Sequence, residues 1–530
     1  MLLIGYVSDE RYAALPGVLL EFEGDGSSIE ATSRATGAVY ADLTSGCYRV
    51  TLYKSGYGQK STEIEIHPQV QPHHFRLLSD GLLCYMWPKW VQAGDQAEFR
   101  VHSVEEYKLE LWRYGLDKEQ VRLIGWYDEH GTRATMQITP DGDYTQTGVE
   151  WNRQGYTSPH HLQFLQAPDR TGLYYLHAST PSGGFFSCPW IVAPAHPSAK
   201  IAVLASNITW NAYNNFGGRS NYISPVKLPA QPTVNARMDL KRYTDPEHIN
   251  YDADTYDPLS FDRPELINHI PLETQITDPI AGRSPNHIAP AEWRFLGWLE
   301  REDFDYDLYA ETQFHFNTLN LDDYQVLIIS THPEYWSRKM YFDLKRWVWE
   351  RGGKLLYLGG NGLNAEVEFL DQSTMIVQNA NQRQWSQDPT IESRFHARVG
   401  ESEANLLGIV YDERGIMTAA PYRAVNEKHW VFNNTGLQKG DTFGHVSLHQ
   451  RVPGGASGHE TDKISVSSPP DVQLLAVGCN ADQGGAQMIT YDTASGGRVF
   501  SAGSITWVSS ILIDDHISRI TANVLETFLS

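Results

Sequence analysis

The pattern of apolar and polar residues changes once along this chain, at about residue 197. Before that point, apolar and polar residues alternate in short runs, such as residues 107–113, and turns rich in glycine separate the runs. This alternation is typical of strands with one buried face. After residue 197, continuous apolar runs such as residues 201–205 alternate with stretches of helical spacing, such as residues 291–299. That combination favours buried parallel strands joined by helices.

Three domains are expected from this pattern and from the length of 530 residues. Residues 1–79 resemble the small transthyretin-like β-sandwich modules that are appended to many enzymes, and they carry no candidate chemistry. Residues 80–196 continue the alternating pattern, and an immunoglobulin-like β domain is the simplest interpretation. Residues 197–530 are expected to form an α/β domain.

One stretch of the third domain places polar groups where α/β proteins bind ligands. The apolar, β-branched run 326–329 predicts a strand that is buried on both faces. His332 and Glu334 follow it, and Ser337 is placed to cap a helix that leads to a second buried strand, residues 354–358. Because ligands bind outside the carboxyl ends of parallel strands, this histidine and carboxylate become candidate functional residues.

The composition limits the kinds of partner. The chain has 64 acidic and 42 basic residues and a formal net charge of -22, which argues against nucleic acid and anionic membrane surfaces as main partners. Its four cysteines lie far apart, so a disulfide framework or a structural zinc site is not expected. We find neither a signal-peptide pattern nor an apolar run near the roughly 20 residues of a membrane helix. A cytoplasmic protein is therefore expected.

Three segments could carry chemistry, and each has a structural alternative. Residues 206–222 follow the first α/β strand and combine many polar side chains with four aromatic ones, but an ordered self-bonded loop fits that composition equally well. His332 and Glu334 could act as base and metal ligand or as an acid–base pair. Taken alone, they fit a histidine satisfied by a carboxylate at a helix start better. Residues 359–362, Gly-Gly-Asn-Gly, could approach a ligand, although a plain tight turn fits better.

Other catalytic patterns are missing. The chain has no Gly-x-Gly-x-x-Gly or Gly-x-Ser-x-Gly motif, and no cysteine stands beside a strand-end histidine. Dinucleotide-binding, serine-hydrolase and cysteine-hydrolase interpretations lose support accordingly. Three spaced histidines for zinc are also missing around His332.

Several of these segments, taken together in order, resemble the large (beta) subunit of the N,N-dimethylformamidases. The resemblance begins at about residue 92 and continues to the C-terminus, so the first module is not covered. Each motif alone is moderately specific, and their shared order is the stronger signal. It is carried by residues 212–214, 217–222, 331–337, 357–362, 455–460 and 496–507.

The resemblance implies a mononuclear iron site, with the iron in the ferric state, held by two tyrosine phenolates and one glutamate. Carried over, Glu334 would be the carboxylate ligand, and Tyr213 and Tyr222 would be the phenolates. The two tyrosine ligands look more widely separated in the family, so Tyr251 and Tyr256 remain alternatives for the second phenolate. Phenolate and carboxylate are hard oxygen donors, which suit ferric iron better than zinc.

The resemblance also implies roles for three further groups. His332 would be the base that takes a proton from iron-activated water. Asn361 and Glu460 would bind or orient the amide. An accessory small subunit and a homo- or hetero-oligomeric state are implied as well.

We therefore expect two N-terminal β-sandwich domains followed by an α/β domain with a mainly parallel, glutamine-amidotransferase-like sheet. The expected function is an iron-dependent amidohydrolase that cleaves a small N-substituted amide, a formamide such as N,N-dimethylformamide, to a carboxylic acid and an amine. Two alternatives stay open: a non-catalytic binding or scaffold protein on the same fold, and a metal-free amidotransferase-like hydrolase.

Overall fold

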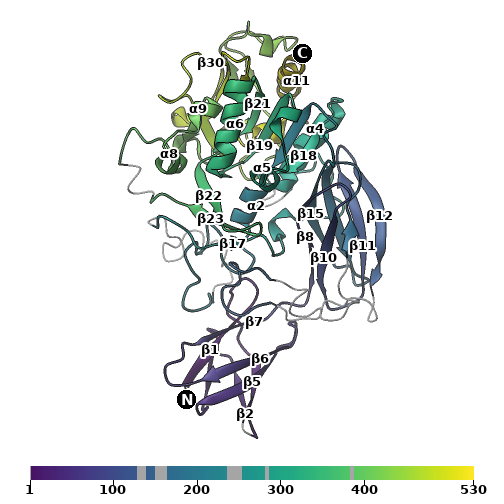
Figure 1. Ribbon diagram of the computed structural model, residues 1–530, viewed down its shortest axis with the longest axis vertical. Helices are drawn as coiled ribbons and strands as arrows, with labels where there is room; N and C mark the ends of the chain where they lie inside the picture. The colour runs from purple at the N-terminus through teal and green to yellow at the C-terminus, as the bar shows by residue number, and fades with distance from the viewer. Residues whose placement is uncertain are drawn as a thin grey trace.

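The computed structural model describes residues 2–24, 26–127, 139–149, 164–234, 253–280, 286–381 and 387–530. Figure 1 shows a small β region with the N-terminus at the lower end, and the largest region with the C-terminus at the upper end. A second β region lies beside the largest one. The predicted boundaries near residues 79 and 196 fall between β7 and β8 and between β15 and β16.

The first region consists of two sheets, with strand orders β4-β1-β7 and β3-β2-β5-β6. Alternation along β5 buries Val50 and Leu52 completely while Arg49 stays exposed, as expected for a strand with one apolar face. The strands are β1 (Leu2–Ser8), β2 (Leu19–Gly24), β3 (Ser27–Thr32), β4 (Ala38–Ala41), β5 (Gly46–Tyr53), β6 (Lys60–Ile66) and β7 (His73–Arg76).

The second region also has two sheets, with orders β13-β10-β8 and β12-β11-β14-β15-β9. A buried ion pair between Lys89 and Glu265, 2.6 Å long, joins it to the third region. The strands are β8 (Leu82–Trp87), β9 (Trp90–Gln92), β10 (Gln96–Ser103), β11 (Tyr107–Tyr114), β12 (Lys118–Tyr127), β13 (Phe164–Gln166), β14 (Gly172–Ser179) and β15 (Phe185–Ala193).

The third region is built on a nine-stranded sheet of order β18-β16-β19-β21-β32-β31-β30-β26-β27. Smaller sheets lie beside it, with orders β17-β23-β22-β20, β24-β29 and β25-β28. The strands of the large sheet are β16 (Ile201–Ala205), β18 (Asp307–Ala310), β19 (Val326–Thr331), β21 (Lys354–Gly359), β26 (Tyr422–Ala424), β27 (Thr442–Phe443), β30 (Gln473–Gly478), β31 (Gln487–Asp492) and β32 (Arg498–Ser501). Those of the small sheets are β17 (Leu259–Ser260), β20 (Tyr335–Trp336), β22 (Ala365–Phe369), β23 (Thr374–Gln378), β24 (Val410–Asp412), β25 (Ala419–Ala420), β28 (Ser457–Gly458) and β29 (Thr461–Lys463).

The prediction of an α/β domain with a mainly parallel sheet is wrong. The strands from β18 to β32 pair in parallel, but every pairing from β32 to β27 is antiparallel, and the structure as a whole is richer in strand than in helix. The physical reason lies in the connections. Only residues 479–486 separate β30 from β31, and only residues 493–497 separate β31 from β32. A parallel pair needs a crossover of a dozen residues or more, so these short links force hairpins.

The central strand and its helix match the sequence pattern. In β19, Val326 and Ile328 pack in one core and Leu327 and Ile329 in the other, which confirms a strand buried on both faces. Ser337 caps the next helix by accepting a hydrogen bond from the backbone of Met340. The helices are α2 (Asn207–Tyr213), α4 (Ala289–Arg301), α5 (Glu311–His315), α6 (Arg338–Arg351), α8 (Arg394–Val399), α9 (Ala404–Leu407), α10 (Trp507–Ser510) and α11 (Asp515–Leu529).

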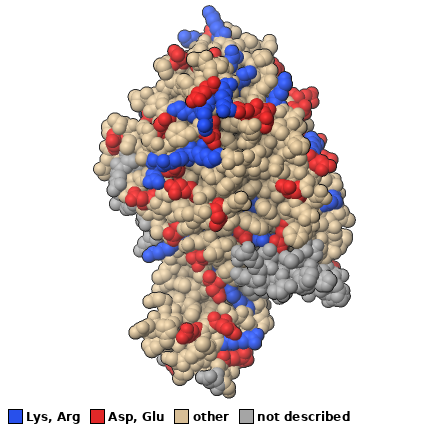
Figure 2. Space-filling model, viewed as in Figure 1, with Lys and Arg blue, Asp and Glu red and all other residues tan. Residues whose placement is uncertain are grey.

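On the face shown in Figure 2, basic side chains lie beside acidic ones over the third region, and no extended surface of one sign forms. Along α6, Lys345 pairs with Glu401 and Arg346 pairs with Asp343. Within the described ranges, we find no helix with the length and apolar character needed to cross a membrane.

Candidate active site

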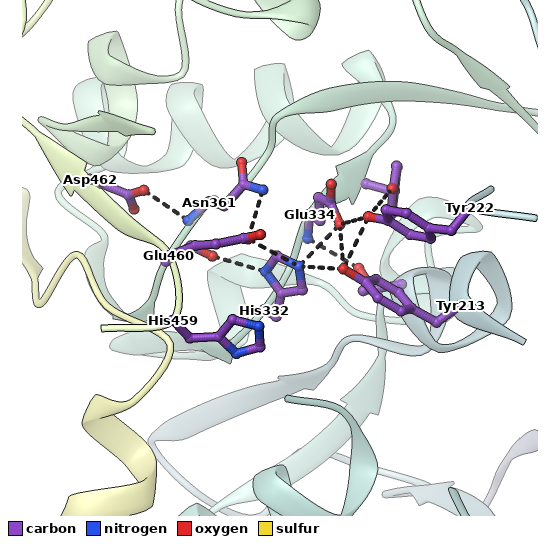
Figure 3. A network of polar contacts seen from close by, with 12 residues as sticks. Tyr213, Tyr222, His332, Glu334, Asn361, His459, Glu460 and Asp462 are labelled. Carbon is purple, nitrogen blue, oxygen red and sulfur yellow. Dashed lines mark hydrogen bonds and ion pairs between the residues drawn. The ribbon is translucent and has the colours of Figure 1, made fainter. Parts of the chain in front are cut away.

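The candidate residues converge at one edge of the large sheet. Because β16, β19 and β21 are parallel neighbours, their carboxyl ends meet at the same edge. The helix α2, which follows β16, ends at Tyr213. Figure 3 shows side chains from these segments and from the link between β28 and β29 directed toward one another. They are Tyr213, Tyr222, His332, Glu334, Asn361 and Glu460.

Two tyrosine hydroxyls meet the Glu334 carboxylate. The Oη atoms of Tyr213 and Tyr222 lie 3.0 Å apart, and they lie 3.2 and 2.6 Å from Glu334 Oε2. The Oη of Tyr335 lies 2.7 Å from that of Tyr222. A single hydroxyl proton cannot bridge to three oxygen atoms at once. The Tyr222 hydroxyl can donate to only one of these oxygens, and it can accept from the hydroxyls of Tyr213 and Tyr335.

Apart from these hydrogen bonds, the spacing of the oxygens also fits a bound cation. For metal–oxygen bonds of about 2 Å, neighbouring ligand oxygens in an octahedral shell are about 2.8 Å apart. The three oxygen–oxygen distances in this cluster run from 2.6 to 3.2 Å. Among the described residues, no group of three or more His, Cys, Asp or Glu is placed to hold a metal ion. That criterion does not include tyrosine, whereas the present cluster consists of two phenols and one carboxylate. Such hard oxygen donors are of the type that suits ferric iron.

Tyr222 reaches this cluster because the chain turns back sharply after α2. Gly218 has a φ of +87°, and a Cβ atom there would lie 2.5 Å from the Cβ of Tyr12. Only glycine tolerates that conformation and that approach. Of the alternative second phenolates, Tyr256 is buried with its backbone N–H donated to Val377, and Tyr251 lies outside the described residues. The choice of Tyr222 stays a prediction, and this geometry favours it.

His332 is held in one tautomer. Its Nδ1 lies 3.0 Å from the carbonyl oxygen of Gly360, which can only accept, so Nδ1 carries a proton. The other nitrogen, Nε2, lies 3.1 Å from Tyr213 Oη, 3.0 Å from Glu334 Oε2 and 3.6 Å from Glu460 Oε2. The lone pair of the neutral ring therefore points at the oxygen cluster.

His332 and Glu334 form a buried charge pair. Burial favours the neutral imidazole, but the charge of Glu334, its hydrogen bond and the charge of Glu460 outweigh burial and raise the pKa of His332 to about 9. Burial likewise disfavours the charged carboxylate, but His332 and then Arg394 outweigh it and lower the pKa of Glu334 to about 2. A cation on Glu334 would repel the proton on His332 and so favour its basic form.

Buried carboxyl groups anchor the helix that carries Tyr213. Glu292 accepts hydrogen bonds from Trp210 Nε1 at 2.9 Å and from the backbone of Ser206 at 3.3 Å. Glu311 accepts from Trp336 Nε1 at 2.7 Å and from the backbone of Ile208. Both carboxyl groups are therefore anchors of α2 and its surroundings.

Strained backbone lies beside the candidate residues. Thr331, Asn361 and His459 have φ values of +64°, +50° and +66°. Two of them directly precede His332 and Glu460, and the third is itself a candidate. A β-branched residue such as Thr331 seldom adopts this region, and such strain tends to cluster at functional sites.

Sequence reasoning missed several groups around the site. Tyr335 contacts Tyr222, and its place in the motif beside Glu334 was the only sequence signal for it. Arg394 Nη2 lies 3.4 Å from Glu334 Oε1. Asp462 Oδ1 accepts a hydrogen bond from the backbone of Asn361. These last two lie far from their partners in the chain, so no local pattern could have identified them.

Comparisons with known proteins point to one family. A family model described as N,N-dimethylformamidase beta subunit-like, C-terminal, matches residues 114–518. The N,N-dimethylformamidase beta subunit of Paracoccus aminophilus is 24% identical over 503 residues, covering 78% of this chain and 62% of the relative. The N,N-dimethylformamidase beta subunit of Alcaligenes sp is 24% identical over 402 residues, covering 64% of this chain and 50% of the relative.

A search of solved structures adds no argument. The Bacillus anthracis TIE protein, for example, is 13% identical, with 38% of this chain and 35% of that chain covered and a TM-score of 0.13. The family match spans most of the third region, all of the candidate residues and part of the second β region. This chain therefore belongs to the N,N-dimethylformamidase beta subunit-like family.

Proposed function

We propose that this chain hydrolyses a small N-substituted amide, a formamide such as N,N-dimethylformamide, to a carboxylic acid and an amine. Family membership and the names of the two curated relatives support this reaction. The chain spans 62% and 50% of the length of those relatives, so activity, substrate and partners are all part of the proposal.

One observation carries the proposal. Three hard oxygen donors, from Tyr213, Tyr222 and Glu334, converge within 3.2 Å of one another, and a histidine nitrogen lies within 3.1 Å of two of them. Under this proposal the three oxygens hold a mononuclear iron in the ferric state. When bound, that iron would supply Lewis acidity toward the amide carbonyl and a lower pKa for water.

The protein's own groups have distinct roles in the proposal. His332 accepts a proton from the attacking water at Nε2, while the Gly360 carbonyl keeps the other proton on Nδ1. The same imidazolium can then give that proton to the nitrogen of the departing amine. The mutual placement of base and oxygen cluster is fixed before the substrate arrives, which lowers the entropic part of the barrier.

Glu460 and Asn361 form the more open side of the site. The Glu460 side chain is 15% exposed, against 1% for His332 and 3% for Glu334. The Nδ2 of Asn361 donates to Glu460 Oε2 at 2.9 Å, and this oxygen lies 3.6 Å from His332 Nε2, so the carboxylate is placed beside the base, where it could orient the amide group. We therefore infer that the substrate reaches His332 past Glu460.

The assembly is also a proposal. Both curated relatives are named as beta subunits. We propose that this chain likewise works as part of an oligomer with an accessory small subunit. Gel filtration with light scattering, alone and with a co-expressed small subunit, would measure the assembly directly.

The proposed activity is tested with N,N-dimethylformamide, by measuring release of dimethylamine. Glu334→Gln should lose both metal and turnover, because it removes the carboxylate donor. His332→Gln should keep the metal and lose most turnover. Glu366→Gln is the control, because it also removes a buried carboxylate, one that pairs with Arg338 on the surface of α6.

Each outcome separates the proposal from its alternatives. Metal-free protein that still hydrolyses the amide would favour a hydrolase without metal. Protein that binds no metal and hydrolyses no formamide would favour a binding or scaffold role. Full activity in both site variants would remove His332 and Glu334 from the mechanism.

A further inference from the structure

The glycine turn, residues 359–362, has a structural reason that its sequence does not reveal. A Cβ atom on Gly360 would lie 2.4 Å from the carbonyl oxygen of Glu460 and 2.8 Å from the backbone nitrogen of Ile505. Glycine is therefore needed because the turn packs against the backbone that carries Glu460. No approach to a ligand is required to explain this residue.

The glycine turn contacts two residues of the proposed mechanism. The carbonyl oxygen of Gly360 accepts the Nδ1 proton of His332 at 3.0 Å. The next residue, Asn361, donates from Nδ2 to Glu460 Oε2 at 2.9 Å. The position of this one turn therefore determines both the tautomer of the base and the placement of Glu460.

Two buried side chains outside the proposed mechanism hold the turn in place. Asp462 Oδ1 accepts a hydrogen bond from the backbone N–H of Asn361, and its Oδ2 accepts one from Tyr357 Oη, both at 2.8 Å. Tyr357 Oη in turn accepts from the backbone N–H of Gly362 at 2.9 Å. Figure 3 shows Asp462 on the far side of Asn361 from His332.

These bonds fix the conformation of the turn at Asn361. Asn361 has a φ of +50°, in the left-handed region. Asp462 is 1% exposed and Tyr357 is fully buried, so water cannot replace either hydrogen-bond partner at little cost. Loss of either group would leave buried backbone N–H groups of the turn without an acceptor.

We propose that Asp462 and Tyr357 are positioning residues for the hydrolysis, which fix the glycine turn and, through it, His332 and Glu460. The inference rests on the proposed function in taking His332 as the base. When the turn moves, the Gly360 carbonyl no longer selects the Nδ1–H tautomer. Part of the population then carries its proton on Nε2, where the lone pair is needed.

The test compares three substitutions of similar size. Tyr357→Phe removes the phenol oxygen that joins Gly362 to Asp462, and Asp462→Asn places an amide N–H₂ against the Tyr357 hydroxyl. Tyr422→Phe is the matched control, because it deletes another fully buried tyrosine hydroxyl, which donates to the Ala502 carbonyl at 2.9 Å. Each variant is labelled with ¹⁵N-histidine and studied without metal. The ring-nitrogen shifts of His332 are assigned by difference from His332→Gln and followed over a pH series until the ring is neutral, where its tautomer can be read.

Turnover of N,N-dimethylformamide is measured on the same preparations. The proposal expects Tyr357→Phe and Asp462→Asn to move the His332 shifts away from the Nδ1–H pattern. It also expects a roughly 10- to 100-fold lower kcat, the scale of loss for a misplaced catalytic group. KM should change much less. Tyr422→Phe should keep both the wild-type shifts and the wild-type kcat.

Two results would overturn the proposal. The first is that Tyr357→Phe has the same His332 shifts and the same kcat as Tyr422→Phe. If Asp462→Asn does not fold, Tyr357→Phe alone decides the question. The second is a lower kcat in Tyr357→Phe with the His332 ring-nitrogen shifts unchanged. Wild-type protein that hydrolyses no amide would instead overturn the proposed function, and the ring-nitrogen shifts would still decide the positioning role.

Discussion

Glu292 gives the clearest prediction about how the site is supported. The residue is 4% exposed, and its carboxyl group accepts hydrogen bonds from Trp210 within α2 and from Ser206 directly before it. Burial raises its pKa from the ordinary value to about 8, although these hydrogen bonds oppose the rise. The perturbation is Glu292→Gln, which has nearly the same shape and no titration.

The sign follows from proton binding in the two states. The unfolded chain loses the Glu292 proton near its ordinary pKa of 4.5, whereas the folded chain keeps it until about pH 8. Between these values the folded state binds more protons, so the free energy of unfolding falls as pH rises, by about 1.4 kcal/mol per pH unit for one group. Glu292→Gln lacks this dependence. The difference in free energy of unfolding between Glu292→Gln and the wild type should therefore shift in favour of the variant by that amount per pH unit, from about pH 5 to 8.

The assay is urea unfolding followed by tryptophan fluorescence at a series of pH values. Glu300→Gln, on the same helix, is the control with the opposite sign. Burial disfavours the charged form of Glu300, but its bonds to Arg113 and Leu116 outweigh burial and lower its pKa, so its contribution is lost as pH falls. Equal pH dependence of the wild type and Glu292→Gln would refute the reasoning.

Three further substitutions test other parts of the account. Gly218→Ala should destabilise the protein by about 2 kcal/mol or more and weaken metal binding, because its Cβ would meet Tyr12 at a φ of +87°; an unchanged unfolding midpoint and metal affinity would contradict this. Lys89→Met should lower the free energy of unfolding by about 3 kcal/mol, because it leaves the buried Glu265 carboxylate unpaired; a midpoint equal to the wild type would show that the pair is not stabilising. Thr331→Gly should lower turnover, because it removes the β-branched residue that fixes the chain directly before His332, whereas stability should change little, since relief of the positive φ is offset by the entropy of glycine and by lost buried contacts; a kcat measurement and a thermal melt check both effects, and an unchanged kcat would contradict the argument.

The sequence predicted best those elements whose cause is local. The strand β19 and the start of α6 follow from an apolar run and a serine cap, and both are confirmed. The prediction of a mainly parallel sheet failed because the apolar runs of β30, β31 and β32 do not indicate the direction in which each strand runs. Their short connections do, since they allow only hairpins.

The candidate residues divide in the same way. His332 and Glu334 were found from their place after a buried strand, whereas Tyr213, Tyr222 and Glu460 came from the family resemblance. The structure brings all five together. This convergence supports their roles, which stay predictions.

The supporting groups could not have been found from sequence. Glu292 meets Trp210, and Asp462 meets Asn361, across 82 and 101 positions of the chain. Such pairs depend on the path of the backbone through the sheet and carry no local pattern. The sequence gives no sign of the backbone strain at Thr331 either, because threonine is a common residue in strands.

The most direct test of the central claim is metal analysis of the purified protein together with its visible absorption spectrum. We expect near-stoichiometric iron and a visible band from tyrosinate-to-iron charge transfer, both lost in Tyr222→Phe combined with Glu334→Gln. Colourless protein that binds no iron, even after reconstitution with ferric salt, would contradict the central claim.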